Sequence, residues 1–261
     1  MSGSRIIGLV SGKGGVGKTS ISVNLGIALA EMGNEVTVVD SDFSASNLGV
    51  YLGRYDHPVK IQQVLHETAD TDSAIFRHPS GIKALTSSNE INMVEPDTSN
   101  FRKVLEDAAE ESDYVLVDSP PGLDTTVETV MASCDELLIV SMPTQTSGIN
   151  AAQIIEKAKE LQKPILGTVV NKVEDDPEME LIEREIEMMT ESNILSQIPY
   201  DSHVKKSLFE NMPLLKHEPL APAALEIKEL AAQIDGQQFE RPSFAGIRRK
   251  FGKLRRNISG Q

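Results

Sequence analysis

A glycine-rich segment from Gly12 to Thr19 constrains this chain more than any other part of it. The segment reads G-K-G-G-V-G-K-T and directly follows the apolar run Ile6–Val10. An apolar strand, a turn of this composition and a helix together form the phosphate-binding loop of nucleotidases. Glycines let successive backbone N–H groups converge on phosphate oxygens, and the following helix directs its positive end at the same anion. The chain is therefore expected to bind a nucleotide here.

Residue types within the loop predict separate roles. Lys18 is placed for the β- and γ-phosphates, and the hydroxyl of Thr19 is placed for Mg²⁺. We expect the nucleotide phosphates to contact the whole loop and the start of its helix: Gly12, Lys13, Gly14, Gly15, Val16, Gly17, Lys18, Thr19 and Ser20.

Lys13 is unusual because it adds a second lysine directly after the first loop glycine. The segment resembles the deviant Walker A signature, K-G-G-x-G-K-T/S, of the MinD/ParA family of P-loop ATPases. This resemblance implies ATP and Mg²⁺ as cofactors and an ATP-dependent homodimer. It also implies a catalytic role for Lys13, which reaches across the dimer interface to the ATP of the partner subunit. The alternative is a solvated surface charge.

The alternation of apolar runs with helical patterns predicts an α/β fold with a mostly parallel sheet and helices on both faces. By resemblance this is the three-layer α/β/α fold of P-loop NTPases. We expect strands at Ile6–Val10, Val36–Asp40, Tyr114–Asp118, Glu136–Val140, Ile165–Val170 and Ile194–Ile198. We expect helices at Lys18–Met32, Phe101–Glu111, Thr125–Ala132, Ser147–Leu161, Met179–Met189, Val204–Glu210 and Pro222–Ile234. Between Gly53 and Glu95 the pattern predicts only a short helix near Ile61–His66.

Two acids separated by one residue, Asp40 and Asp42, end the second expected strand. A carboxylate at a strand end beside the phosphate site can hold Mg²⁺-bound water or orient an attacking water. The pair resembles the D-x-D of switch I in MinD-like proteins. That resemblance implies that Asp42 positions the hydrolytic water, that Asp40 supports the metal, and that Asn47 is a switch residue. A turn or helix cap is the alternative for Asp42.

The segment Tyr114–Asp118 is followed by Ser-Pro-Pro-Gly, so an apolar strand ends in an acid and a Pro/Gly turn. It resembles a Walker B strand followed by switch II. The resemblance implies that Asp118 contacts Mg²⁺ through water, which suits the retained hydration of this ion. Pro120 and Gly122 belong to the implied switch, and glycine permits a loop that moves when the γ-phosphate leaves.

Two later strand ends predict the base site. Asn171 resembles the base-contacting Asn of the family, and its amide offers a donor and an acceptor to a purine edge. Pro199, Tyr200 and Asp201 match the segment that covers the adenine in the family. Tyr200 as a core-edge aromatic and Asp201 as a cap of the next helix are the alternatives.

Charge is distributed unevenly along the 261 residues, whose net charge is −14. From Arg241 onward there are seven Lys or Arg and no Asp or Glu, so an acidic body ends in a basic tail. This asymmetry indicates an anionic partner for the tail. Cys134 is the only cysteine, which excludes an internal disulfide and a multi-cysteine metal site within one chain. No apolar run reaches the ~20 residues of a membrane span, and we expect a cytoplasmic protein.

The tail, residues 243–261, predicts a basic amphipathic helix. Its apolar residues recur with spacings of three and four, which places them in one stripe: Phe244, Ile247, Phe251, Leu254 and Ile258. Cations occupy the rest of the surface and include Arg248, Arg249, Lys250 and Lys253. Such a helix suits an anionic membrane surface and is similar to the membrane-targeting helix of MinD. A helix packed on the acidic body, a disordered end and nucleic acid as its target are the alternatives.

We interpret the chain as an ATPase domain (residues 1–235), a linker (236–242) and a membrane-targeting tail (243–261). The resemblance implies a slow, Mg²⁺-dependent MinD-like ATPase that dimerises on ATP and binds the membrane peripherally. By this resemblance the ATPase takes part in positioning a cell-division site or another cellular structure. It acts with an activating or positioning protein that the sequence does not identify. A ParA-like DNA-dependent partition ATPase, an FlhG-like regulator of a surface appendage and a nucleotide-binding scaffold remain alternatives.

Overall fold

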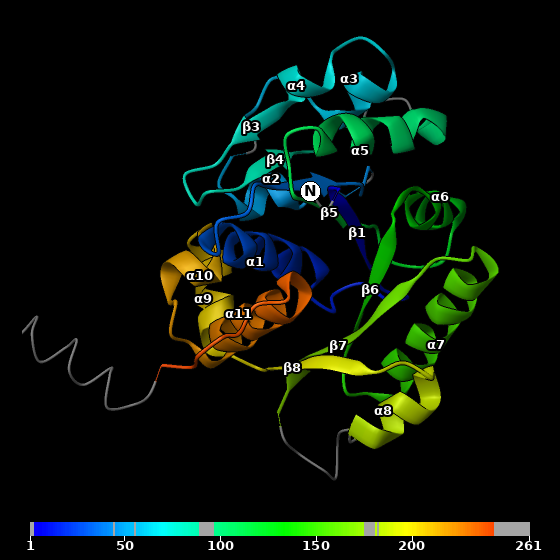
Figure 1. The fold of residues 1–261 in the computed structure, drawn as a ribbon, viewed down its shortest axis with the longest axis vertical. Coiled ribbons are helices and arrows are strands. Elements are labelled where there is room, and N and C mark those ends of the chain that lie inside the picture. The colour runs from blue at the N-terminus through cyan, green and yellow to red at the C-terminus, as the bar shows by residue number, and fades with distance from the viewer. Residues whose placement is uncertain are drawn as a thin grey trace, which may run out of the picture.

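The computed structural model describes residues 3–43, 45–54, 56–88, 97–174, 181 and 183–242. Its centre is an eight-stranded sheet in the order β3-β4-β2-β5-β1-β6-β7-β8, in which β3 alone is antiparallel to its neighbour (Figure 1). The strands are β1 Arg5–Val10, β2 Val36–Asp40, β3 Ile75–Arg77, β4 Lys83–Leu85, β5 Tyr114–Asp118, β6 Glu136–Ser141, β7 Ile165–Val173 and β8 Ile194–Pro199.

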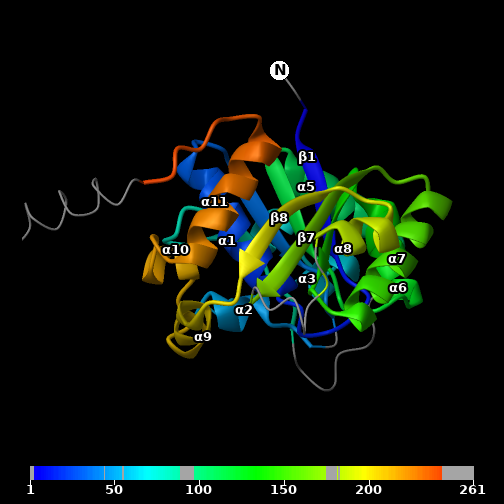
Figure 2. The ribbon, with the colours of Figure 1, turned by 90° about the horizontal axis from the view of Figure 1, so that it is seen from below.

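Helices cover both faces of the sheet. On one face, α1 and α11 pack side by side (Figure 1). Figure 2 shows α11 between α1 and β8, with β7 and β8 seen at the edge of the sheet. The helices of this face are α1 Lys18–Glu31, α2 Leu48–Tyr51, α9 Ser202–Phe209, α10 Leu214–His217 and α11 Pro222–Asp235.

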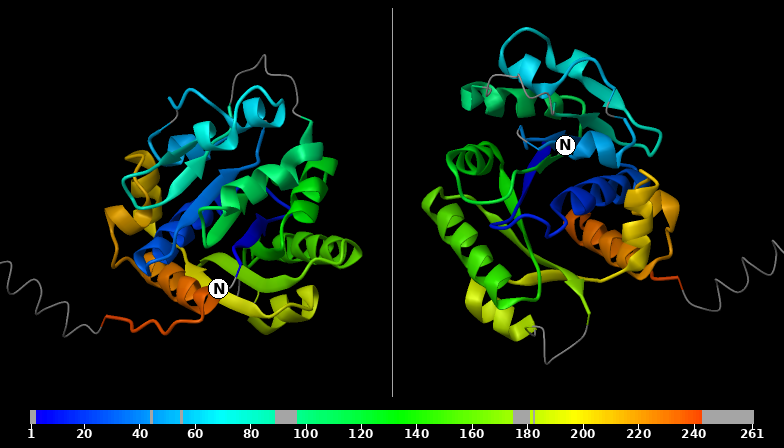
Figure 3. Two further views of the ribbon diagram at one scale, coloured as in Figure 1. Left: turned by 45° about the horizontal axis from the view of Figure 1, so that its top comes forward. Right: turned by 180° about the vertical axis from the view of Figure 1, so that it is seen from behind.

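The opposite face carries the remaining helices, and both views in Figure 3 show α6 and α7 on that side. Here α5 packs against α6, and α7 packs against α8. The helices of this face are α3 Ile61–Leu65, α4 Thr71–Ala74, the 3₁₀ turn Thr98–Asn100, α5 Phe101–Ala109, α6 Thr125–Ser133, α7 Gln145–Glu160 and α8 Glu183–Thr190.

The strand residues alternate between two hydrophobic cores, one under each helical layer. Ile7 and Leu9 of β1 belong to the core beneath α1 and α11, whereas Ile6 and Val10 belong to the core beneath α5 to α7. Because both faces of the strand are buried, its sequence is almost continuously apolar. This explains why the apolar runs predicted the central strands.

The centre of the sheet positions the candidate site. β1 lies between β5 and β6, and the chain continues from β1 through α1 to β2 on one side of it. Strand order reverses at this point, and ligands of open α/β sheets bind at such a reversal, beyond the carboxyl ends of the strands. The register pairs Asp40 of β2 with Asp118 of β5, so the two strand-end acids become neighbours.

The predicted fold class is confirmed, and each of the six expected strands is present, three of them with bounds extended at the carboxyl end. The segment Gly53–Glu95 also contains β3 and β4, which the sequence did not predict. Each has only three residues, too few to show a strand pattern. The expected helix Met179–Met189 is described only in part, as α8. The predicted tail, residues 243–261, lies outside the described residues, and none of the described helices is both long and apolar enough to span a membrane.

Candidate functional site

The N-terminus of α1 is open to an anion. Its N-cap is Gly17, which has φ +101° and no side chain to cap the helix, and the first turn of the helix contains no acidic residue. Gly15 also adopts a left-handed conformation, with φ +78°. The first amide groups of a helix have no partner within it, so this loop presents unused N–H donors and the positive end of α1 to one place. The loop therefore fits the phosphates of a nucleotide.

Lys18 is buried at the base of the loop. Its ammonium donates a hydrogen bond of 2.9 Å to the Ser11 hydroxyl, and that hydroxyl in turn donates to the Lys13 carbonyl at 2.9 Å. Burial lowers the pKa of Lys18, although the nearby charges of Asp118 and Asp42 act in the opposite direction. A buried cation beside an anion-binding turn is matched to polyphosphate. Ser11 was not predicted, because one serine at the end of β1 carries no distinctive pattern.

The two strand-end acids lie side by side and are buried, at the wall of the cavity. Burial raises the pKa of Asp118 to about 6, against hydrogen bonds from Thr19 and Ser22 and the charge of Lys18. Burial, together with the charge of Asp118, raises the pKa of Asp40 to about 7. Desolvation disfavours both ionised forms, and a cation placed between the carboxylates would reverse this effect.

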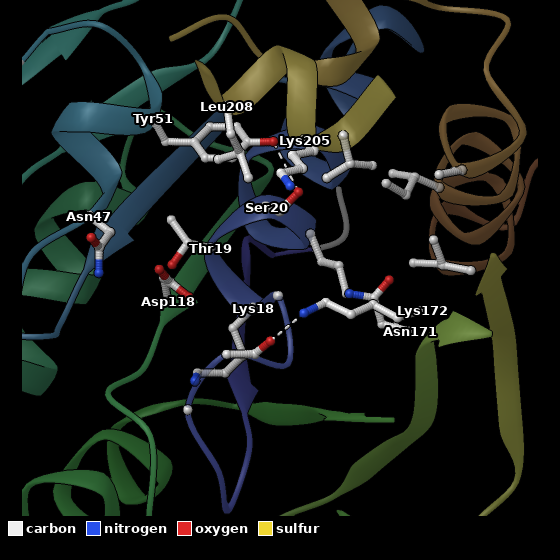
Figure 4. A pocket seen from close by; sticks show the side chains of 18 of the residues that line it. Lys18, Thr19, Ser20, Asn47, Tyr51, Asp118, Asn171, Lys172, Lys205 and Leu208 are labelled. Carbon is white, nitrogen blue, oxygen red and sulfur yellow. Dashed lines mark hydrogen bonds between the residues drawn. The ribbon is translucent and has the colours of Figure 1, made fainter. Parts of the chain in front are cut away.

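The oxygen donors around Asp118 fit Mg²⁺. The Thr19 side chain lies beside the Asp118 carboxylate (Figure 4), and Ser22 donates to Asp118 Oδ1 at 3.3 Å. Within the described ranges, no three His, Cys, Asp or Glu side chains gather closely enough to hold a metal ion by themselves. Mg²⁺ keeps several waters and is usually held by one or two protein groups together with substrate phosphates. This donor set therefore suits the ion as a partner of a bound nucleotide.

Asp40 organises the segment that follows β2. Its Oδ1 accepts the amide of Asp42 at 3.0 Å, and its Oδ2 accepts the Ser46 hydroxyl at 2.6 Å and the Leu48 amide at 3.4 Å. These contacts hold the segment after β2 against the strand end. The geometry thus gives Asp40 a defined structural task, and its support of a metal stays a prediction.

Asp42 and Asn47 lie at the edge of the cavity. Asp42 is half-buried and accepts the amide of Ala45 at 2.9 Å, a contact typical of a turn. The exposed Asn47 donates to the Ala45 carbonyl at 2.7 Å and is the N-cap residue of α2. The structure thus supports a turn role for Asp42, and its water-positioning role stays a prediction.

The segment after β5 is tied to the phosphate loop. The amide of Gly122 donates to the Ser11 carbonyl at 3.0 Å, and Gly122 has φ +109°, a conformation that glycine readily adopts. Pro120 is buried, and its carbonyl accepts the Ser119 hydroxyl at 2.9 Å. A movement of the phosphate loop can therefore shift the segment after β5 through the hydrogen bond between Gly122 and Ser11. A switch segment needs such a connection.

A cavity of about 640 Å³ joins the phosphate loop to the expected base site (Figure 4). This volume lies within the range of small-molecule pockets. Asn171 lines the cavity at the end of β7 and donates to the Val16 carbonyl at 2.6 Å. Tyr200 also lines it and is 56% exposed, and its contact with an adenine stays a prediction. Asp201 accepts the His203 amide at 2.9 Å and caps α9, which confirms the helix-cap alternative, and it lines the cavity as well.

The cavity also brings together residues that the sequence did not indicate. Tyr51 of α2 forms a hydrogen bond of 2.9 Å with the Ser20 hydroxyl, and Lys205 and Leu208 of α9 line the cavity as well (Figure 4). Lys172 extends from β7 to the loop carbonyl of Gly15. Isolated tyrosine, leucine and lysine residues in helices are indistinguishable from core or surface residues until the fold brings them together.

Lys13 is exposed at the tip of the loop, and its side chain is not part of the cavity wall. This placement agrees both with a solvated charge and with a contact to a second subunit. Its predicted role across a dimer interface therefore stays a prediction.

The sheet, the loop at the N-terminus of α1 and the paired strand-end acids define a P-loop nucleotide-binding domain with a three-layer α/β/α architecture. The model of the CobQ/CobB/MinD/ParA nucleotide binding domain family matches residues 7–214 of the chain. The chain belongs to this family, which confirms the resemblance to MinD/ParA proteins.

Individual relatives agree with this assignment. An uncharacterized ATP-binding protein of Methanocaldococcus jannaschii is 34% identical over 88% of this chain and 88% of its own length. The septum site-determining protein MinD of Pyrococcus horikoshii OT3, complexed with Mg-ADP, superposes with a TM-score of 0.84 at 28% identity, covering 89% of this chain and 96% of that chain. The MinC:MinD cell division protein complex of Aquifex aeolicus gives a TM-score of 0.81 at 25% identity, covering 91% of this chain and 98% of that chain. These relatives support ATP and Mg²⁺ as the cofactors of this cleft.

Proposed function

We propose that this protein is a MinD-type ATPase, in which the bound nucleotide switches the chain between monomer and dimer. The observation that carries the proposal is the uncapped N-terminus of α1, which lies at the same cavity as buried Lys18 and Asp118. The similarity to an ATP-binding protein and to MinD complexed with Mg-ADP supports ATP and Mg²⁺ as ligands.

Each proposed role follows from a position in the cleft. The loop amides and Lys18 bind the phosphates, and Thr19 and Asp118 hold the hydrated metal. Bound Mg²⁺ supplies charge neutralisation for the phosphates. Asp42 is close enough to Lys18 to affect its pKa, and in this position its carboxylate can orient a water molecule. A half-buried carboxylate can accept a hydrogen bond from that water.

Lys13 completes the site of a second subunit in this proposal. Its exposure at the loop tip leaves the ammonium free to reach a neighbouring triphosphate, and such a cation stabilises transferred phosphoryl charge. A single subunit therefore lacks one catalytic cation and turns over slowly. ATP then favours pairing, because the triphosphate of each subunit binds a cation of the other.

Steady-state phosphate release and nucleotide binding test this arrangement. Lys13→Ala should reduce turnover at least tenfold and leave ADP binding nearly unchanged, whereas Lys18→Ala should weaken nucleotide binding itself. Lys103→Ala, at an exposed position of α5, is the matched control. Wild-type turnover in Lys13→Ala would contradict a site assembled from two subunits, and a wild-type protein that binds ATP without hydrolysing it would favour the scaffold.

We propose the membrane as the surface on which this dimer acts. Cations near an anionic leaflet contribute up to about 1 kcal/mol each. One tail of residues 243–261 is therefore expected to bind weakly, and two tails on one dimer gain ~10²–10⁴-fold through avidity. ATP-driven pairing would then control membrane residence without any change in the tail. Similarity to a septum site-determining protein supports a role in positioning.

Co-sedimentation with anionic vesicles tests this step. The full chain should sediment with vesicles in ATP and Mg²⁺ more than in ADP, and a chain lacking residues 241–261 should not sediment in either. A DNA duplex offered in parallel distinguishes the partition alternative. Stimulation of ATPase activity by DNA and not by vesicles would replace the membrane with DNA as the proposed surface. Similarity to the MinC:MinD complex supports a protein partner for this chain.

A further inference from the structure

The carboxyl end of β7 has an irregular backbone at Lys172. Lys172 has φ +63°, and the register between β7 and β8 shifts between Asn171 and Val173. A lysine in the left-handed region costs about 1 kcal/mol or more, and such a conformation persists only where the surroundings hold it. The irregularity turns Lys172 out of the strand while Asn171 keeps its place beside the phosphate loop.

Both side chains bind backbone carbonyls of the loop. The Lys172 ammonium donates to the Gly15 carbonyl at 2.6 Å, and Asn171 Nδ2 donates to the Val16 carbonyl at 2.6 Å. Figure 4 shows Lys172 reaching from the end of β7 to the loop, with its hydrogen bond drawn as a dashed line. Two consecutive loop peptides are thus held from outside by one strand end.

Because each peptide is planar, these contacts also fix the direction of the N–H groups of Val16 and Gly17. The described residues contain no cis peptide bond, and in a planar trans peptide the C=O of one residue and the N–H of the next point in opposite directions. Holding the Gly15 carbonyl toward the end of β7 therefore directs the Val16 N–H away from that strand end. Holding the Val16 carbonyl does the same for the Gly17 N–H. A charged donor on the carbonyl also polarises the N–H of the same peptide.

The fit between loop and strand end is close. A Cβ added at Gly17 would lie 2.3 Å from Asn171 Nδ2, so the Asn171 side chain occupies space that a side chain at position 17 would need. Lys172 also lines the cavity along with Asn171. The end of β7 thus contacts the loop on the side of the expected base site. Its two hydrogen bonds hold the carbonyls of Gly15 and Val16.

We infer that Lys172 is a positioning residue that orients the phosphate-binding amides of Val16 and Gly17 by holding the loop from the base side of the cleft. The inference rests on the proposed function, since the ligand that it orients for is the triphosphate of that site. Its action passes through the loop backbone and does not require a contact with the base. Loss of the ammonium should therefore weaken phosphate binding whether or not a base is attached.

Binding of ATP and of inorganic tripolyphosphate, each with Mg²⁺ and measured by displacement of a fluorescent ATP analogue, tests this inference. Lys172→Met keeps the stem and removes the ammonium, and it should weaken both ligands by a similar factor, about tenfold for loss of a charged hydrogen bond. Lys205→Met removes one cation from the same cavity without touching the loop, and it should weaken both by no more than about threefold. Lys172→Arg should recover most of the affinity.

A second measurement does not depend on affinity. In ligand-free protein, the ¹⁵N–¹H resonances of Val16 and Gly17 should move in Lys172→Met and stay in place in Lys205→Met. Weakening of ATP alone, with tripolyphosphate unchanged, would overturn the inference in favour of a base contact. Equal losses of affinity in Lys172→Met and Lys205→Met would also overturn the inference, because they would show that any cation in the cavity has the same effect. Failure of the wild-type protein to bind the ATP analogue would instead refute the proposed function.

Discussion

Asp118→Asn should raise the stability of this protein and at the same time weaken its proposed binding of Mg²⁺. Asp118 is 3% exposed, and burial raises its pKa from 3.8 to about 6 in the protein without nucleotide. A shift of roughly two units, at about 1.4 kcal/mol per unit, corresponds to about 3 kcal/mol of unfavourable free energy for the ionised carboxylate at pH 8. The asparagine is neutral and nearly isosteric, so the variant should unfold less readily than the wild type.

The sign of the pH dependence follows from linkage. The folded state holds its proton to a higher pH than the unfolded state, so this carboxyl lowers stability as pH rises from about 4 to about 6, and its effect is constant above that range. The stability difference between Asp118→Asn and the wild type should be up to about 3 kcal/mol at pH 8 and roughly half of that at pH 5. The same variant should lose the Mg²⁺-dependent part of its nucleotide affinity.

Urea unfolding in EDTA at pH 8 and pH 5 measures the first effect, and titration with ADP in the presence and absence of Mg²⁺ measures the second. Asp72→Asn, at an exposed position of α4, is the matched control and should change neither quantity. A variant that is less stable than the wild type at pH 8, or a gap that grows on acidification, would refute the electrostatic argument. Retained Mg²⁺ dependence would remove Asp118 from the metal site.

Three further outcomes are expected. Gly17→Ala should weaken ADP binding, measured by calorimetry, more than tenfold, because the new Cβ would lie 2.3 Å from Asn171 Nδ2. Gly33→Ala is the control, because Gly33 has a similar φ of +99° and its added Cβ would meet no atom within 4 Å. ADP binding should be unchanged in this control. Burial lowers the pKa of His78, so the stability lost in His78→Gln, measured in urea, should be smaller at pH 5.5 than at pH 7.5; equal losses would contradict this. Burial raises the pKa of Cys134 to about 12, so iodoacetamide should label it only after unfolding, and rapid labelling of native protein would show that the thiol is accessible.

Much of the fold was predictable because burial on both faces leaves a direct mark on the sequence. Val36–Asp40 and Tyr114–Asp118 have the predicted bounds, since an apolar run between polar turns defines each strand. β4 has no such mark. Its three residues, including Lys83, form a strand by pairing with β3 on one side and with β2, distant in sequence, on the other.

The candidate site was predictable where its chemistry depends on loop glycines and strand-end acids. The adjacency of Asp40 and Asp118 follows from the register between β2 and β5, which the sequence does not contain. Ser11 and Lys172 were not predicted, because each acts on a backbone carbonyl or a neighbouring side chain that only the folded loop brings near. Contacts of this kind leave no residue pattern.

Sedimentation velocity in ATP and in ADP, each with Mg²⁺, tests most directly the central claim that the nucleotide in this cleft controls pairing of the chain. The run with ATP uses the Asp42→Ala variant, because loss of the proposed water-orienting carboxylate should prevent hydrolysis of ATP during the measurement. The account predicts a dimer with ATP, a monomer with ADP, and a monomer in both when Lys13→Ala is added. A single mass that does not depend on the nucleotide would contradict it.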